Sequence, residues 1–267
     1  MLKRLLSKKN RALLSELVRT DFKLRYQGSV LGYAWSLLRP LFMFVILYVV
    51  FAYVFKIGDN VPNFPIYLLL GIVMWNFFTE TTQQGLTSIV GRGDLIRKIK
   101  IPSWLIVVST SFNALINLAI NLAVVIVFAL ITRMDLLSTS VLLPFYLLEI
   151  YALALGVSLL LSALYVKYRD VLYIWEVFLQ AGFYLTPILY PVALITAVWA
   201  QKLMILNPLA QTIQGARKAF VTPESISISD IYSSNIVVLA PLALTLLVLV
   251  VGVLYFRSQS KNFAENL

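Results

Sequence analysis

The stretch SWLIVVSTSFNALINLAINLAVVIVFALI occupies residues 103–131 and contains no charged side chain. An α-helix needs roughly 20 consecutive apolar residues to cross the hydrocarbon core of a bilayer. This stretch exceeds that length, and further apolar segments of similar character occur on both sides of it. We therefore expect an all-α integral membrane protein that forms one transmembrane domain over residues 1–267.

The apolar segments predict six transmembrane helices, at residues 33–55, 64–82, 103–131, 141–166, 171–189 and 235–256. An amphipathic segment at residues 10–27 precedes them, with leucines on one side and charged residues on the other. This pattern predicts a helix lying on the membrane surface, the alternative being a solvated basic tail.

Residues 190–234 differ from the spans because their polarity is mixed and prolines interrupt them. Two short helices, Trp199–Leu206 and Ala210–Phe220, are expected on either side of the break at Asn207-Pro208. We expect them on the outer side, where they are re-entrant or act as a gate. Non-helical backbone inside the membrane is tolerated only when protein shields it or when it faces water.

The composition excludes several classes of chemistry. Hydrophobic residues make up 60% of the chain and charged residues only 13%, whereas soluble domains carry about 25% charged residues. The chain has no Cys and no His, so disulfides, thiolate nucleophiles and imidazole catalysis are ruled out. There is no phosphate-binding loop of the G-x-x-x-x-G-K-[ST] type and no acidic metal cluster. We expect no catalytic residue, no metal site and no cofactor on this chain.

The net charge of +10 reflects membrane topology rather than nucleic-acid binding. Most of the 22 Lys and Arg residues fall in the N-terminal segment, in the loops after spans two and four, and in the C-terminal tail. Positive loops stay in the cytoplasm, so both termini are expected there. The first 30 or so residues lack the apolar core of a cleavable signal peptide.

An aromatic stripe runs along one face of the first span, made of Phe44, Tyr48, Phe51 and Phe55 at helical spacing. Aromatic rings offer flat apolar faces that suit sliding contact with sugar rings. We expect these residues to line a transport path, helped by Tyr184 and Tyr190 near the outer exit. Ordinary packing or lipid contact is the alternative.

A polar stripe on span three contains Ser109, Asn113, Asn117 and Asn121. Polar residues at this spacing either hold helices together or line a wet path, and we favour the first. Glu149 lies well inside span four, where an ionisable residue either serves a function or hydrogen-bonds a neighbouring helix while neutral, and its role stays open.

The loop after span two, residues 91–102, has the pattern of a short docking helix. Asp94 is expected to cap it, and Pro102 follows it. The helix would have an apolar side bordered by basic side chains, which suits docking into a cleft on a partner protein. The apolar side consists of Leu95, Ile96 and Ile99, and the basic residues are Arg97 and Lys98. A helix lying on anionic lipid is the alternative. Arg169 and Asp170, in the loop after span four, are expected to make a secondary contact.

These features together resemble one known family, the membrane subunits of polysaccharide ABC exporters. The segments that carry the resemblance occur in the expected order over nearly the whole chain: Asp21-Phe22-Lys23-Leu24-Arg25-Tyr26, Leu31-Gly32-Tyr33-Ala34-Trp35-Ser36-Leu37-Leu38-Arg39-Pro40, Gly71, Trp75-Asn76-Phe77-Phe78, Asp94-Leu95-Ile96-Arg97-Lys98 with Pro102, Tyr168-Arg169-Asp170, Tyr184-Leu185-Thr186-Pro187-Ile188-Leu189-Tyr190-Pro191, and Asn207-Pro208-Leu209. Arg39 departs from the family pattern, which has an uncharged polar residue there.

The resemblance implies a homodimer in the bacterial cytoplasmic membrane that binds two copies of a separate ABC ATPase. That partner would bind the ATP and Mg²⁺, and the dimer would export a lipid-linked polysaccharide such as O-antigen, capsule or teichoic acid. The resemblance also implies that residues 94–99 couple to the ATPase and that the outer helices form a gate.

Three other functions stay open. An ABC permease for a drug or small lipid would share the span pattern, but often carries a larger extracellular domain. An integral-membrane glycosyl or acyl transferase is disfavoured by the lack of His and of converging carboxylates. A passive channel would have no ATPase partner.

Overall fold

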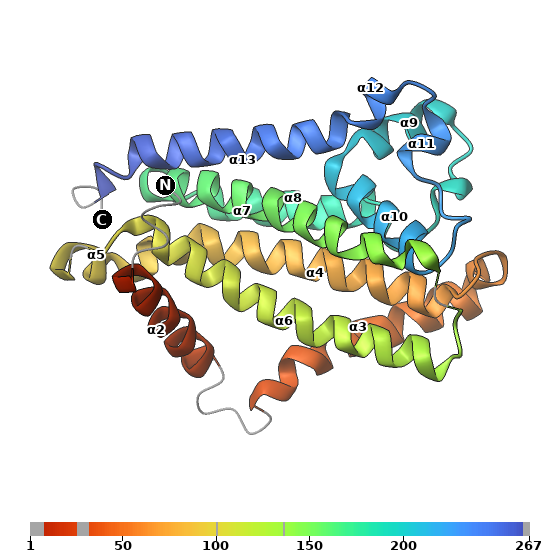
Figure 1. Cartoon of the computed structure of the whole chain (residues 1–267), viewed down its shortest axis with the longest axis horizontal. Helices are drawn as coiled ribbons and strands as arrows, with labels where there is room; N and C mark the ends of the chain where they lie inside the picture. Colours follow the sequence, from red (N-terminus) through yellow and green to blue (C-terminus); the bar gives the residue numbers. More distant parts are fainter. Residues whose placement is uncertain (1–7, 26–31, 100, 136, 264–267) are drawn as a thin grey trace.

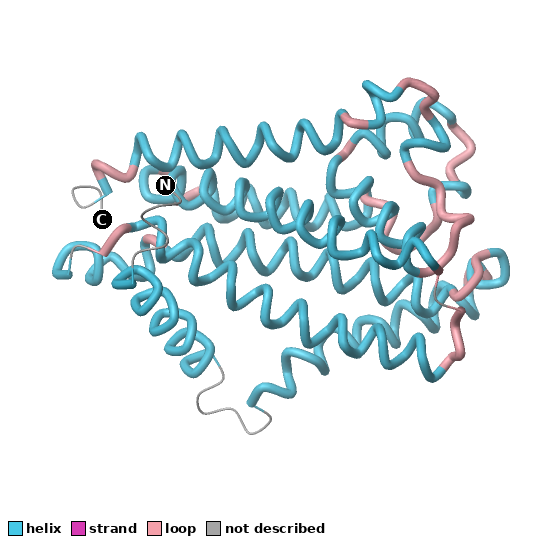
Figure 2. The backbone as a smooth tube through the Cα atoms, viewed as in Figure 1, coloured by secondary structure: helices cyan, strands magenta, loops and turns pink. Residues whose placement is uncertain are grey.

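The structure is a computed structural model that describes residues 8–25, 32–99, 101–135 and 137–263. The described residues form helices and connecting loops, with no strand among them (Figure 1, Figure 2). The elongated bundle has helices α2 and α5 at one end and the short helices α9 to α12 at the other. We call the first the coupling end, after the role expected for α5, and the second the hairpin end, after the hairpin formed by α9 and α10.

Five helical segments are long and apolar enough to cross a membrane: Trp35–Val54, Phe64–Ser88, Ser103–Ile131, Ser138–Lys167 and Ala240–Gln259. The first comprises α3 (Trp35–Tyr48) and a π-helical extension, η2 (Val49–Val54). The other four correspond to α4 (Phe64–Ser88), α6 (Ser103–Ile131), α7 (Leu143–Lys167) preceded by the 3₁₀ turn η5 (Ser138–Leu142), and α13 (Ala240–Gln259). The fold is therefore all-helical with several candidate membrane spans.

The remaining helices are shorter. They are α2 (Lys8–Arg25), η1 (Gly32–Ala34), η3 (Ile57–Asn60), η4 (Val90–Arg92), α5 (Gly93–Ile99), α8 (Val171–Leu185), η6 (Val192–Leu194), α9 (Val198–Leu206), α10 (Pro208–Phe220), α11 (Ile228–Ile231) and α12 (Asn235–Val238).

Helix α4 forms the centre of the bundle. In the most apolar stretch of α4, 78% of the residues are buried, whereas in that of the first span, Trp35–Val54, only 11% are buried. It packs against α3, α6, α7, α8 and α10. This arrangement fits its sequence, because α4 has apolar residues on all sides in its first half and a helix of that kind is stable only when neighbours surround it.

Helices α7 and α13 cross in direct backbone contact. A side chain on Gly252 would collide with the backbone oxygen of Gly156, and one on Gly156 would meet the backbone of Leu249. Small residues at a helix crossing allow this approach and gain van der Waals contact inside a membrane. The two glycines therefore hold α13 against the bundle.

Some helix ends differ from the sequence-based boundaries. The span expected at residues 171–189 ends at Leu185, because the backbone turns extended at Thr186 and Pro187 follows. The span expected at 235–256 is divided into α12 and α13 at Leu239, just before Pro241. The span expected at 64–82 continues to Ser88, and the surface helix begins at Lys8 rather than at residue 10.

Helix α2 lies along α6 at the coupling end. Its leucines at positions 13, 14 and 17 are half-buried, while Glu16 and Arg19 are exposed. The two-sided pattern in the sequence thus corresponds to a side that meets the bundle and a side that does not.

Candidate functional site

A helical hairpin at the hairpin end is inserted among the longer helices. It consists of α9 and α10, and Asn207 between them caps α10 by accepting a hydrogen bond from the backbone amide of Leu209. Pro208 stands at the first position of α10, where its missing amide proton is not needed. Helix α10 packs against α4, α7, α9, α13 and η5, and of its residues only Lys218 is not buried.

Arg217 of α10 is fully buried and is the group that fastens this hairpin to the bundle. Its guanidinium group donates to the backbone oxygens of Tyr67 (2.9 Å), Pro187 (2.6 Å) and Ile188 (2.6 Å). It also lies over the ring of Tyr67, 3.7 Å from the centroid. A buried charge is costly unless hydrogen bonds satisfy it, and these contacts supply that compensation.

The space for this guanidinium depends on Gly71 of α4. A side chain at Gly71 would collide with the guanidinium group of Arg217. Glycine at this position is therefore required by the close approach of α10 to α4. Sequence reasoning identified Gly71 through the family resemblance and left Arg217 without a role, although a cation inside a short and mostly apolar or uncharged helical segment was the available signal.

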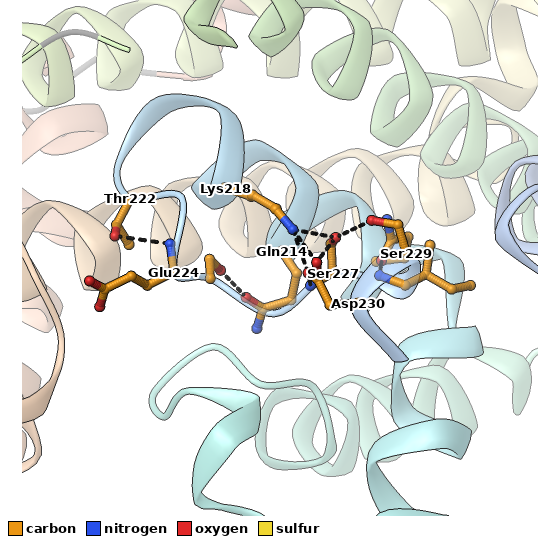
Figure 3. A network of polar contacts seen from close by, with 10 residues as sticks. Gln214, Lys218, Thr222, Glu224, Ser227, Ser229 and Asp230 are labelled. Carbon is orange, nitrogen blue, oxygen red and sulfur yellow. Dashed lines mark hydrogen bonds and ion pairs between the residues drawn. The ribbon is translucent and has the colours of Figure 1, made fainter. Parts of the chain in front are cut away.

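A second polar network lies beside Arg217 and joins α10 to the segment that follows it (Figure 3). The ammonium group of Lys218 donates to both carboxylate oxygens of Asp230 at 2.5 Å, and Gln214 accepts from Ser225 at 2.9 Å. Burial opposes ionisation of Asp230, but hydrogen bonds from Lys218 and Ser227 outweigh it and hold its pKa below the ordinary value. The network keeps residues 222–230 folded against α10.

Glu149 of α7 is buried beside Thr212 of α10. The interpretation that it contacts a neighbouring helix therefore has a specific partner, helix α10 of the hairpin. Gln214 adds a further tie, since it accepts a hydrogen bond from the hydroxyl of Tyr67 at 3.3 Å and donates to the oxygen of Pro187 at 3.3 Å.

Helix α8 presents two different outward faces. Its inner side packs on α4, where Trp175 donates to Thr82 and Phe183 meets Trp75 edge-on. One exposed face is apolar, with Ile174, Phe178 and Leu185. The other carries polar and aromatic side chains at helical spacing: Tyr173, Glu176, Gln180 and Tyr184, all exposed in the single chain. Polar side chains are costly in lipid, so this face favours contact with a second molecule or with water.

The predicted aromatic stripe is only partly outward-facing. Phe44 is buried, stacks on Tyr48 at 5.7 Å and meets Phe128 of α6 edge-on at 6.0 Å. Tyr48 and Phe51 are half-buried, and Phe55 is exposed. The burial of Phe44 agrees with the packing alternative, while a path-lining role for the other three stays a prediction.

Tyr184 and Tyr190 lie together at the hairpin end. The hydroxyl of Tyr190 donates to the backbone oxygen of Tyr184 at 2.9 Å, and Tyr184 itself is exposed. The bond joins the end of α8 to the turn that leads into the hairpin, which is where an exit was expected.

The polar stripe of α6 contacts a different element at each step. Ser109 accepts from Arg92, Asn113 donates to Asp21 at 3.5 Å, Asn117 donates to Glu80 at 2.6 Å, and Asn121 donates to the backbone oxygen of Ser36 at 3.3 Å. These residues therefore join α6 to η4, α2, α4 and α3 in turn. The structure favours the interpretation that they hold helices together.

Helix α5 is placed at the coupling end as expected, but its side chains are arranged differently. Asp94 lies in the first turn of the helix rather than at the cap, because the helix already begins at Gly93. Ile96 is buried within the chain, in a cluster with Ile89, Ile106 and Phe263. Its apolar character is thus explained by internal packing.

Leu95 is half-buried, and Asp94 and Arg97 are exposed and form an ion pair at 3.5 Å. The side chains of Lys98 and Ile99 lie outside the described part of the chain. Leu95, Asp94 and Arg97 therefore make up the described surface of α5. In the other loop, Arg169 lies over the ring of Tyr165 at 5.1 Å, and Asp170 stands at the start of α8; both are exposed.

An ion pair connects the surface helix to the approach of α5. Asp21 of α2 pairs with Arg92, the last residue of η4, and both side chains are more than four-fifths buried. Arg92 also donates to Ser109 of α6 at 3.2 Å, and Asn113 of α6 donates to Asp21. Arg92 immediately precedes α5, so a movement of α5 is transmitted to α2 and α6 through these contacts.

The fold is that of a multi-pass membrane protein, in which a helical bundle with five candidate spans carries the short helix α5 at one end and an inserted hairpin at the other. A family model described as ABC-2 type transporter matches residues 12–221, from α2 to the end of α10. The chain belongs to the ABC-2 type transporter family.

Curated relatives are named as export permeases. The O-antigen export system permease protein RfbA of Myxococcus xanthus is 30% identical over 211 residues, covering 79% of this chain and 80% of the relative. Two proteins of the same name from Klebsiella pneumoniae are 28% and 27% identical over 256 and 254 residues, covering 95% of this chain and 94% of each relative.

We predict that Arg217→Met releases the hairpin from the bundle. Three buried backbone oxygens lose their donor, and hydrogen bonds from a charged group each contribute roughly 1.5–3 kcal/mol. The purified variant should unfold at a lower temperature and be cut faster by protease at residues 186–234. Gly71→Ala should cause the same change, whereas Lys202→Met, at an exposed lysine of α9, should not. Equal melting temperatures for Arg217→Met and wild type would contradict the assignment.

A charge swap tests the ion pair between α2 and η4. Asp21→Arg or Arg92→Asp alone should place two like charges together and increase amide hydrogen exchange in α2, about fivefold for roughly 1 kcal/mol. The double variant Asp21→Arg with Arg92→Asp should restore much of the protection. Glu16→Lys, an exposed change on the same helix, serves as the control. A double variant no better protected than either single variant would show that the pair does not hold α2.

Proposed function

We propose that two copies of this chain form the membrane path of an ATP-driven exporter for a polysaccharide carried on a lipid. The observation that carries the proposal is the polar face of α8, in which Glu176 and Gln180 are exposed on the outside of an apolar helix. In a dimer that places this face at its centre, the two copies would enclose a path lined by these polar side chains and accessible to water. Such a path suits a chain rich in hydroxyl groups. The names of the curated relatives support a glycan as the substrate.

The exposed apolar surfaces supply a dimer contact beside this path. Helix α3 is the least buried of the long helices, and its outward residues include Phe42, Val45 and Ile46. The second face of α8 is equally apolar. Both helices pack on α4, so a partner chain can meet them while the core of each copy stays intact.

ATP hydrolysis is assigned to a separate ABC ATPase, present in two copies and docked at the coupling end. Membership of the ABC-2 family supports such a partner in general. The described surface of α5 offers Leu95 as an apolar contact and Asp94 with Arg97 as a charged rim. We place the complex in the bacterial cytoplasmic membrane with both termini on the cytoplasmic side, following the distribution of Lys and Arg. On this proposal the chain is a transport subunit and catalyses no reaction itself.

Single cysteines test the path, because the natural chain contains none. Gln180→Cys should react with a water-soluble, membrane-impermeant maleimide in the assembled transporter, since the reactive thiolate forms only where water reaches it. Val250→Cys, at an exposed apolar position of α13, should react far more slowly because lipid surrounds it. Bound or trapped glycan should protect Gln180→Cys. Equal labelling at both positions would argue against a wet face on α8.

The ATPase contact is tested by Leu95→Asp in a cell that lacks the chromosomal copy of this chain. Burial of Leu95 in a partner cleft contributes at most roughly 1.5–3 kcal/mol, and an aspartate there would be desolvated without a partner. We expect the ABC ATPase to be lost on co-purification and surface glycan to fall to background. Arg97→Ala should keep the ATPase bound, since an exposed ion pair contributes about 0–1 kcal/mol. Wild-type chain that fails to restore surface glycan would refute the proposed function itself.

A further inference from the structure

A pocket of about 480 Å³ lies at the hairpin end, between the last turns of the first span and the start of α4. Its lining includes Tyr48, Ala52, Tyr53, Lys56, Asn63 and Phe64. Its volume falls within the ~300–1,000 Å³ range of small-molecule sites. Its described walls come from one chain, so it is present in each copy before any dimer forms.

The backbone is strained at two residues that line this pocket. Lys56 has φ of 53° and Asn63 has φ of 54°, and among the described non-glycine residues only Arg133 shares this left-handed conformation. Such residues persist only where the surrounding structure enforces them, and they concentrate at ligand sites. Both left-handed residues are polar and belong to the lining.

The chemistry of the lining suits a sugar ring. Tyr48 and Tyr53 stand edge to face with their centroids 6.0 Å apart, and Tyr48 lies 6.4 Å from the ring of Phe64. Such rings receive the C–H faces of a pyranose, while Lys56 and Asn63 can hydrogen-bond its hydroxyl groups. Among the described residues of the lining Lys56 is the only cation, whereas phosphate groups are generally held by several donors with fixed geometry.

The pocket is joined directly to the hairpin. The side-chain amide of Asn63 donates to the backbone oxygen of Val221 at 3.5 Å, and Val221 is the residue that follows α10. A ligand that engages Asn63 therefore touches a group that makes one of the contacts at the C-terminal end of α10, to which Thr139 and Arg217 also contribute. Asn63 connects the pocket to the hairpin.

We propose that this pocket binds one pyranose unit of the glycan as the chain leaves the membrane. The proposal rests on the proposed function and adds to it a sugar-sized site at the exit, outside the path between the two copies. Bound sugar that hydrogen-bonds Asn63 competes with the contact from this side chain to Val221.

The test measures sugar binding without ATP, using the transporter purified with its ATPase in lipid nanodiscs. The probes are the methyl glycosides of rhamnose, mannose, galactose and N-acetylglucosamine, followed by saturation-transfer NMR from protein to sugar protons. At least one glycoside should show transfer to its ring C–H protons. Tyr53→Ala should weaken its binding roughly tenfold, because one aromatic face is lost.

Two further variants complete the design. Ala52→Phe should abolish binding by filling the pocket, and Tyr53 is exposed, so its removal should leave the melting temperature unchanged. Phe145→Ala, at an exposed aromatic residue of the same end of the bundle, should bind like wild type. Glycerol 3-phosphate is the competing probe for a lipid headgroup.

The proposal is overturned if no glycoside binds, if Tyr53→Ala and Ala52→Phe bind like wild type, or if glycerol 3-phosphate displaces the sugars from the pocket. Surface glycan is measured in the same strains. Wild-type chain that restores export while the pocket binds no sugar overturns the pocket alone, whereas failure to restore export overturns the proposed function.

Discussion

The buried guanidinium of Arg217 is the interaction on which the architecture depends. It joins the end of α10 to α4 and to the extended turn after α8, three segments that are far apart in the sequence. The compensation comes from backbone oxygens and from the ring of Tyr67, so the contact fixes positions of the main chain itself. Because only a glycine at position 71 leaves room for it, the hairpin has one register against the bundle. The turn that carries Tyr190 and the first part of α4 are both joined to α10 by this contact.

The coupling end works by a different physical principle, since its ties are ion pairs and amide contacts along one helix. Helix α6 hydrogen-bonds to α2, η4, α4 and α3 through successive polar residues, and it is itself connected to α5 by a short link. A force on α5 is therefore distributed across the bundle rather than delivered to one helix. At the hairpin end α10 is buried and fixed by Arg217, whereas the coupling end is polar and partly exposed.

Much of this arrangement could be predicted from the sequence, and the failures have physical causes. The 103–131 span was predicted with its observed bounds, because a long uncharged run with Pro102 before it leaves little freedom. The span at 171–189 was predicted too long, because hydropathy does not register the extended backbone at Thr186. Ile96 was assigned to a docking surface because helical spacing shows which residues share a side but not whether the chain itself covers that side. Arg217 was missed because its partners are backbone oxygens, which no residue pattern reveals.

The short length of α8 has a consequence for the lipid around it. Its 15 residues rise about 22 Å, well below the ~30 Å thickness of a bilayer's hydrocarbon core. The remaining depth at this point is occupied by the turn after Leu185 and by the inserted hairpin. A span shorter than the hydrocarbon core is accommodated by local thinning of the bilayer or by neighbouring protein, and each ångström of mismatch costs a fraction of a kcal/mol. Helix α8 therefore relies on the turn after Leu185 and on the hairpin, rather than on its own length, to match the thickness of a bilayer.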